Sequence, residues 1–323
     1  MTHRYSLVVP LLNDINEFED TLASVLRHRP PHSQVIVVHN GGYLDPHQLD
    51  DEVELTTVEG RPSLAKVLNQ AMDLADGEYL ALVRPGVEID ENWQLPVEDA
   101  FGSERVASVA PLLINVNRPT RIVAAGVETD GFKNRNLCAT NNRLTASNIG
   151  KANPLGPTHW FAIYRRDVLN AIGQLDERMD DCYLDVEIGL ALKTLGFKCS
   201  FEPDVVGHLE SDVPIRRESR KPHGYSSQRS LQRYSNGGFA QKMAACAREI
   251  ARSPFDSRWL QHMFQRFSAG RHLHEDQQFH DQLVAARTRK VWENDTADHP
   301  VTLKPFATPK VSSPSPTPRR RAA

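Results

Sequence analysis

Three aspartates lie close together in the second half of the chain. Asp180 and Asp181 come just before Asp185, and the apolar spacing that follows predicts a helix over 185–195. A carboxylate that reaches a substrate hydroxyl can act as a general base, which accelerates a reaction by about 10²–10⁴-fold. The other role open to Asp185 is to cap the helix, because aspartate often accepts hydrogen bonds from the first N–H groups of a helix. This segment is therefore a candidate catalytic site.

The cysteines and histidines indicate no further site. The four cysteines are widely spaced and include no CxxC pair, so neither a disulfide framework nor a structural zinc site is expected. A histidine cluster lies near the C-terminus, without a cysteine or an ordered ligand spacing, which favours a solvated helix face over a metal site. Its members are His262, His272, His274 and His280.

The first hundred residues alternate apolar runs with amphipathic stretches. The pattern predicts strands at 6–9, 34–38, 53–58 and 78–83, with helices at 17–28 and 62–75. This β-α-β-α-β order predicts an α/β fold with a mostly parallel central sheet flanked by helices. Such sheets bind ligands at the carboxyl ends of their strands. The loops at 10–14, 39–45 and 84–88 are therefore the predicted binding region.

Three regions are predicted along the chain. Strand-like runs and a helix continue from about residue 106, so residues 1–211 are expected to form one α/β domain. Residues 212–294 have a basic, helical pattern, and residues 295–323 are rich in Pro, Ser, Thr and Arg, which is typical of a disordered tail.

The charge is unevenly distributed between these regions. Residues 1–211 contain 18 Lys and Arg against 31 Asp and Glu, a net charge of −13, whereas residues 212–323 contain 20 against 10, a net charge of +10. The basic part can pack against its own acidic domain, or it can contact an anionic surface such as a membrane. It lacks the interleaved aromatic residues of a single-strand nucleic-acid platform, so nucleic acid is not an expected partner.

The hydropathy pattern contains no membrane segment. No apolar run approaches the roughly 18 residues of a membrane span, and the first residues lack the apolar region and cleavage site of a signal peptide. The expectation is a cytoplasmic protein, with peripheral contact at the inner face of the membrane through the basic part.

Five stretches follow one another along the chain: SLVVPLLND, VIVVHNGGYLD, GRPSLAKVLNQAMDLADGEYLALVRPGVEID, HWFAIYRRDVLNAIGQLDERM and YLDVEIGLALKTLGFKCSFEPDVVGH. Together they resemble family 2 glycosyltransferases of the GT-A fold. The phrase RPGVEID is most similar to rhamnosyltransferase-type members of that family. The resemblance spans residues 5–211 and implies a GT-A-like fold with a helical C-terminal extension. It also implies an inverting transferase that moves a sugar from a nucleotide-diphosphate donor to a hydroxyl of a glycan or another acceptor.

The resemblance implies roles for particular residues. Asp185 matches the general base of the family, although Leu184 replaces the acid that usually precedes it. His39 stands where the family has an aspartate that contacts the base or ribose. For Asn69, on the predicted second helix, a packing role is the alternative. The implied contacts to the nucleotide sugar are Pro10, Asn13, His39, Asn40, Asp45, Asn69 and Arg84.

The metal site is where the chain departs most from the family. Members usually carry a DxD motif after the fourth strand, and its last Asp binds Mn²⁺ or Mg²⁺. Here the segment reads Arg84-Pro85-Gly86 and offers no side-chain oxygen, which hard divalent ions require. His208 matches an additional ligand of some members, with a structural histidine as the alternative. Arg84 can instead pair with the diphosphate bidentately, so transfer without a metal ion is conceivable.

Two functions from different classes follow. The first is the inverting transferase, with a nucleotide sugar and a hydroxyl acceptor as partners and no metal cofactor assigned. The alternative is a catalytically inactive GT-A-like binding or regulatory protein. Arg84-Pro85-Gly86, His39 and Leu184 favour the alternative, whereas Asp185 and the retained loops favour the enzyme.

Overall fold

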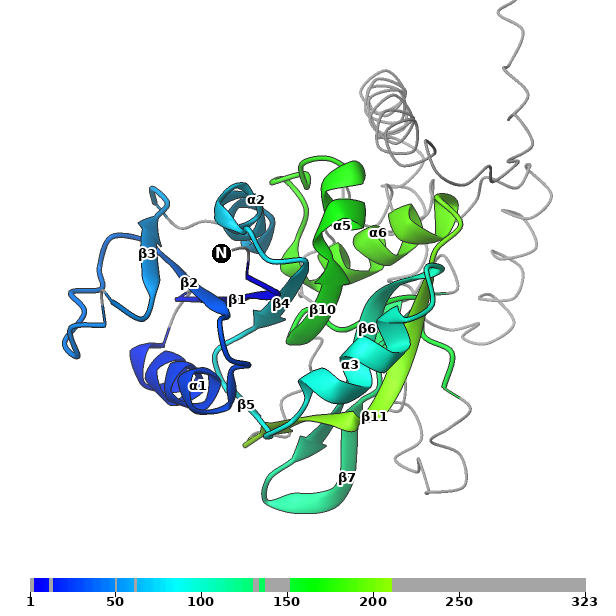
Figure 1. Ribbon diagram of the computed structural model, residues 1–323, viewed down its shortest axis with the longest axis horizontal. Helices are drawn as coiled ribbons and strands as arrows, with labels where there is room; N and C mark the ends of the chain where they lie inside the picture. Colours follow the sequence, from blue (N-terminus) through cyan, green and yellow to red (C-terminus); the bar gives the residue numbers. More distant parts are fainter. Residues whose placement is uncertain are drawn as a thin grey trace, which may run out of the picture.

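The computed structural model describes residues 3–11, 14–49, 51–60, 63–129, 134–136 and 152–210 (Figure 1). The predicted basic region at 212–294, the predicted tail at 295–323 and Asn13 lie outside the described residues. The boundaries proposed for the three regions therefore stay predictions.

Strands from both halves of the described chain form a single nine-stranded sheet, in the order β3-β2-β1-β4-β10-β6-β11-β5, with β7 paired to β6. A separate two-stranded sheet pairs β8 with β9. The strands are β1 (Tyr5–Pro10), β2 (Gln34–His39), β3 (Glu54–Thr57), β4 (Tyr79–Val83), β5 (Val87–Ile89), β6 (Val106–Asn115), β7 (Arg118–Ala124), β8 (Val127–Thr129), β9 (Asn134–Asn136), β10 (Phe161–Arg165) and β11 (Lys198–Leu209).

The four strands predicted in the first hundred residues are all present. β3, β2, β1 and β4 lie side by side and are parallel throughout, which confirms the expected β-α-β-α-β order. The other half of the sheet is mixed. β10 runs antiparallel between β4 and β6, whereas β11 is parallel to β6. The sheet is thus mixed, with its uniformly parallel part at the N-terminal end of the chain.

Helices cover both faces of the sheet, as predicted. One apolar cluster joins α1 and α3 to Leu7 and Val9 of β1, and another joins α2, α5 and α6 to Val8 of the same strand. Because successive side chains of a strand point to opposite faces, β1 is buried on both sides. The helices are α1 (Ile15–His28), α2 (Leu64–Leu74), α3 (Gln94–Phe101), α5 (Arg166–Ala171) and α6 (Asp181–Thr194).

The helix that carries Asp185 begins earlier than its sequence pattern predicts. α6 starts at Asp181, with Asp180 at the N-cap position, so Asp185 lies inside the helix. The alternative in which Asp185 caps this helix is therefore wrong. Leu184, which replaces the acid usual in the family, is buried in the apolar cluster on the face of the sheet that α2, α5 and α6 cover.

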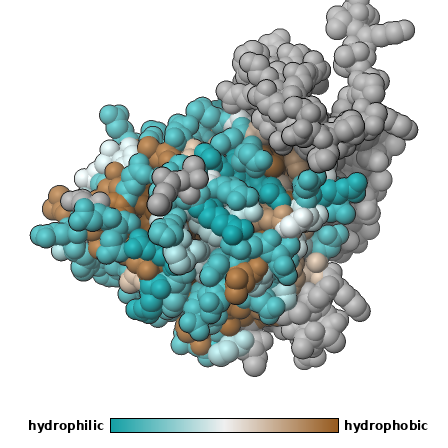
Figure 2. Space-filling model, viewed as in Figure 1, coloured by the Kyte–Doolittle hydropathy of each residue, from teal (hydrophilic) through white to brown (hydrophobic). Residues whose placement is uncertain are grey.

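The outer surface is largely polar on the face shown in Figure 2, where apolar residues form separate areas. The most exposed large apolar side chain of the described part is Leu44, which is 92% exposed in the loop after β2. No helix in the described ranges combines the length and the apolar composition that crossing a membrane requires.

Candidate active site

Three of the sequence-predicted site residues meet at the carboxyl edge of the parallel strands. Pro10 ends β1, His39 ends β2, and Arg84 follows β4 directly. The antiparallel strand β10 begins at this same edge, because Phe161 pairs with Val83. The predicted binding edge therefore also receives the residues that precede β10, which no sequence motif assigns to the site.

A tight turn fixes the backbone at Arg84. The amide of Val87 donates to the carbonyl of Arg84 over 3.2 Å, and Gly86 has a φ of 88°. Proline and a glycine with positive φ at the two central positions are typical of a type II turn. The amide of Gly86 also donates to Thr21 Oγ1 of α1 over 3.0 Å. The segment that replaces the DxD motif is therefore an anchored turn, with the Arg84 side chain at its start.

The Arg84 side chain is only 12% exposed. Its guanidinium carbon lies 4.9 Å from the ring centroid of Trp160, and Nη2 lies 3.8 Å from Asp181 Oδ2. Burial lowers the pKa of Arg84, and the carboxylates of Asp181 and Asp185 oppose that shift. Because an arginine stays protonated in proteins, the site holds a permanent, poorly hydrated positive charge.

Asp185 is fully buried and bonded to a histidine. Its Oδ2 lies 3.0 Å from His159 Nδ1 and also accepts from the His159 amide over 3.4 Å. The side chain of Asp185 has no exposed surface, and that of His159 is 6% exposed. When Asp185 is ionised, the ring proton belongs on Nδ1, where it donates to the carboxylate. The proposed base is thus one half of a His159–Asp185 pair.

Asp181 connects three elements of the site. Its Oδ1 accepts from the amide of Leu64 over 2.9 Å, at the start of α2, while its Oδ2 faces Arg84 of the β4 edge. An acidic group at the N-terminus of a helix is favourable because the helix dipole is positive there. Asp181 is therefore held in place independently of Arg84.

The loop after β2 is stabilised by hydrogen bonds between its own polar groups and backbone amides. His39 is buried, its Nδ1 accepts from the Gly41 amide over 3.2 Å, and burial lowers its pKa. Asn40 Oδ1 accepts from the Gly42 amide over 3.3 Å, and Asp45 Oδ2 accepts from the Leu49 amide over 2.7 Å. His39 is accordingly neutral, with Nε2 as its N–H donor. Asn40 and Asp45 shape the loop through one oxygen each.

Asn69 uses both ends of its amide in packing. Nδ2 donates to the carbonyl of Leu175 over 2.9 Å, and Oδ1 accepts from the Leu175 amide over 2.8 Å. Asn69 is buried, so these bonds join α2 to the segment before α6. This geometry supports the packing role that the sequence left open.

We expect Asn69→Ala to lower the free energy of unfolding by about 2–4 kcal/mol, because it leaves both backbone groups of Leu175 buried without their partner. Urea unfolding followed by circular dichroism measures this. Asn170→Ala, at an exposed position of α5, is the control and should change little. A loss of nucleotide affinity with unchanged stability would contradict the packing role.

His208 lies on β11 and pairs with Glu88 of β5 in the sheet register. Its Nε2 is 2.8 Å from Asp90 Oδ1. Across the described residues, no three His, Cys, Asp or Glu side chains gather as metal ligands would. With an arginine at the DxD position, these residues do not fit the Mn²⁺ or Mg²⁺ site of the family. The metal-ligand role of His208 stays a prediction.

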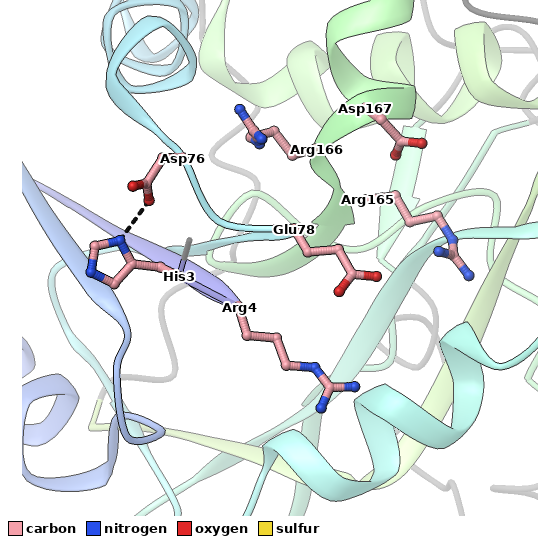
Figure 3. A pocket seen from close by; sticks show the side chains of 7 residues that line it. All are labelled: His3, Arg4, Asp76, Glu78, Arg165, Arg166 and Asp167. Atoms are coloured by element: carbon pink, nitrogen blue, oxygen red, sulfur yellow. Dashed lines mark hydrogen bonds and ion pairs between the residues drawn. The ribbon is translucent and has the colours of Figure 1, made fainter. Parts of the chain in front are cut away.

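A shallow cavity of about 440 Å³ lies at the opposite edge of the sheet, before β1 and β4 (Figure 3). Two of its charged groups bond to other parts of the protein. His3 Nδ1 lies 2.7 Å from Asp76, and Arg165 Nε donates to the Val106 carbonyl over 2.8 Å. This cavity is separate from the strand ends that carry Arg84. It is lined by His3, Arg4, Asp76, Glu78, Arg165, Arg166 and Asp167.

Two solved structures with a similar fold contain a nucleotide or a nucleotide sugar. Staphylococcus aureus TarS in complex with UDP-GlcNAc superposes with a TM-score of 0.53 and 18% identity, over 90% of this chain and 91% of that chain. GalNAc-T7 with UDP, GalNAc and Mn²⁺ gives a TM-score of 0.53 and 15% identity, over 70% of this chain and 48% of that chain. Identities this low establish the fold alone.

One curated relative has a name that also concerns saccharides. The O-antigen biosynthesis protein RfbC of Myxococcus xanthus is 24% identical over 227 residues, which is 64% of this chain. The chain spans only 17% of the length of that relative. No protein-family model matches the chain. The topology and these structural matches show that the chain has the fold of GT-A glycosyltransferases.

Proposed function

We propose that this protein is an inverting glycosyltransferase that uses a nucleotide-diphosphate sugar without a metal ion. The observation that carries the proposal is the buried guanidinium of Arg84 at the carboxyl edge of β4, near both Asp181 and Asp185. A permanent cation at this edge supplies the positive charge that a leaving diphosphate needs. The rhamnosyltransferase-like subgroup suggested by RPGVEID is part of the same proposal.

The donor is proposed to lie along the strand ends. Pro10, His39, Asn40 and Asp45 surround the nucleoside, and Arg84 contacts the diphosphate. Asn13, which follows β1 in the sequence, belongs to this set as an expectation from the sequence. Solved proteins of the same fold have UDP or UDP-GlcNAc in their structures, which supports a nucleoside diphosphate as the ligand class.

In the proposed reaction, the acceptor hydroxyl attacks the anomeric carbon from the face opposite the diphosphate. The new bond forms as the bond to the diphosphate oxygen breaks, which inverts the configuration at that carbon. The His159–Asp185 pair takes the hydroxyl proton, as a general base does. Arg84 stabilises the charge that develops on the leaving diphosphate, which is the usual role of a preorganised cation.

A product assay tests the proposal. The full chain is incubated with UDP-, GDP- and dTDP-sugars and a set of saccharide acceptors, with EDTA in one series and Mn²⁺ in another. We expect at least one donor to release its nucleoside diphosphate in EDTA, in step with a glycosylated acceptor. Release that occurs only with Mn²⁺ would contradict the metal-free reaction.

A second candidate function is binding without catalysis. The observation that favours it is the complete burial of the Asp185 side chain, together with a leucine in place of the usual preceding acid. A binding protein of this kind would take up a nucleotide sugar but would show no turnover with any acceptor. Equal donor affinity for the wild type and Asp185→Asn, with no product from either, would support this function.

We also propose that the basic part at 212–294 contacts an anionic surface, at the inner face of the membrane. Each Lys or Arg near anionic lipid contributes roughly 1 kcal/mol. The full chain should therefore sediment with phosphatidylserine-containing vesicles at low salt and be released at high salt. Vesicles of phosphatidylcholine alone are the control. If the chain stays in the supernatant with anionic vesicles at low salt, the membrane contact is refuted.

A further inference from the structure

Two buried nitrogen donors of the candidate active site have no hydrogen-bond partner among the described residues. They are Nε of Arg84 and Nε1 of Trp160. A buried donor without a partner is costly, so such groups are uncommon in folded proteins. These two donors belong to side chains that contact each other, so one cause can explain why both lack a partner.

The backbone brings these side chains together. The Arg84 amide donates to the Trp160 carbonyl over 2.9 Å, where β10 begins beside the end of β4. The guanidinium lies over the face of the indole, 4.9 Å from its centroid. Since the indole N–H lies in the plane of the ring, this contact leaves it unused. Trp160 is half-buried and Arg84 is 12% exposed, so each side chain keeps some accessible surface, although the two donor atoms themselves are buried.

The chemistry of the two groups determines which kind of ligand they can bind. Guanidinium and indole donate hydrogen bonds and accept none, so the missing partner is an acceptor. A cation in a water-poor site favours an acceptor with negative charge. Asp181 does not fill this role, because it faces Nη2 at 3.8 Å and its other oxygen is bonded to the Leu64 amide. An oxyanion on a ligand would supply such an acceptor to both donors.

We propose that Arg84 and Trp160 form a two-donor receptor for the diphosphate of the donor in its metal-free form. The proposal rests on the function proposed above and adds Trp160 as a binding residue of that site. A divalent ion on the diphosphate would place positive charge beside the guanidinium and occupy the oxygens that the two donors need. Divalent ions should therefore compete with this receptor.

A variant of Asp181 is expected to bind the anion more tightly, which is the opposite of the effect expected for the two donors. The carboxylate of Asp181 is the nearest negative charge to the guanidinium, and it repels an incoming anion. Asp181→Asn keeps an oxygen for the Leu64 amide and removes the charge. This variant should bind pyrophosphate more tightly than the wild type, whereas variants of the two donors should bind it more weakly.

Calorimetric titration of inorganic pyrophosphate and of UDP into the full chain, in EDTA, measures these effects. Trp160→Phe keeps the aromatic face and removes the N–H, and it should weaken both ligands about tenfold, as the loss of a hydrogen bond to a charged group does. Asp181→Asn should strengthen both, and Mg²⁺ should weaken binding to the wild type. Thermal unfolding of each variant checks that it is folded.

A spectroscopic measurement covers the case in which Trp160→Phe does not fold. The chain has four tryptophans, so its ¹⁵N spectrum contains few indole N–H signals, and Trp160→His or Trp160→Tyr can identify the one from Trp160. Pyrophosphate should move that proton signal downfield, as a new hydrogen bond does. If Arg84→Ala weakens binding while Trp160→Phe does not, and the indole signal stays in place, the receptor is refuted and the proposed function is not. If the wild type binds neither ligand in EDTA, the receptor is refuted, and the proposed function is refuted as well only if GDP- and dTDP-sugars also fail to bind.

Discussion

Asp185→Asn should lower the turnover of the proposed transfer by about 10²-fold or more, with the dissociation constant of the donor little changed. The amide has the shape of the carboxylate but cannot take a proton. The substitution also removes the negative charge to which His159 Nδ1–H donates. In the wild type, Nδ1 lies 3.0 Å from Asp185 Oδ2. Turnover is measured as nucleoside diphosphate release at saturating donor and acceptor, and affinity by titration.

The variant His159→Gln tests the contribution of His159 to turnover separately from that of Asp185. If the ring carries the proton from the acceptor, this variant should lose turnover as Asp185→Asn does, and the acid limb of the pH–rate profile should move. Glu187→Gln is the matched control, because Glu187 is a buried acid on the same helix. Full turnover in Asp185→Asn would contradict the role of the pair.

Arg84→Ala should raise the dissociation constant of the donor by about 10–100-fold, since a charge-assisted contact contributes about 1.5–3 kcal/mol. Arg84→Lys keeps the charge but loses the planar fork and its stacking on Trp160, so an intermediate loss is expected. Arg84→Asp should bind more weakly still, and Mn²⁺ should not rescue it because Gly86 offers no second ligand.

The stability of the Arg84 variants has to be measured beside their affinity. Arg84 lies on Trp160 and near Asp181, so its removal can disturb the packing at the end of β4. Equal affinity of Arg84→Ala and the wild type for every donor, in folded protein, would exclude this residue from the diphosphate site.

The parallel half of the fold was predictable because its signals are local. The strands at 34–38 and 78–83 are short apolar runs bounded by turn residues, and the helix at 17–28 has a regular apolar spacing. In the structure these become β2, β4 and α1, with bounds that differ by only a few residues. The carboxyl edge that carries Pro10, His39 and Arg84 follows from that order alone.

The rest of the site depends on contacts that no local pattern contains. The run HWFAIY predicts a strand but not its direction, and only the antiparallel insertion of β10 places Trp160 beside Arg84. In the same way, Asp185 meets His159 across 26 positions of the sequence. The early start of α6 was missed because Asp180 and Asp181 precede the apolar spacing from which the helix was predicted.

Transfer without a metal ion requires that a nucleoside diphosphate binds at the Arg84 edge in the absence of divalent ions. Titration of UDP-, GDP- and dTDP-sugars into the full chain, in EDTA and again in Mn²⁺, tests it most directly. We predict that at least one donor binds in EDTA, that Mn²⁺ does not improve its affinity, and that Arg84→Ala weakens it. Binding that requires Mn²⁺, or no binding of any of these donors, would contradict metal-free binding of the donor at this edge.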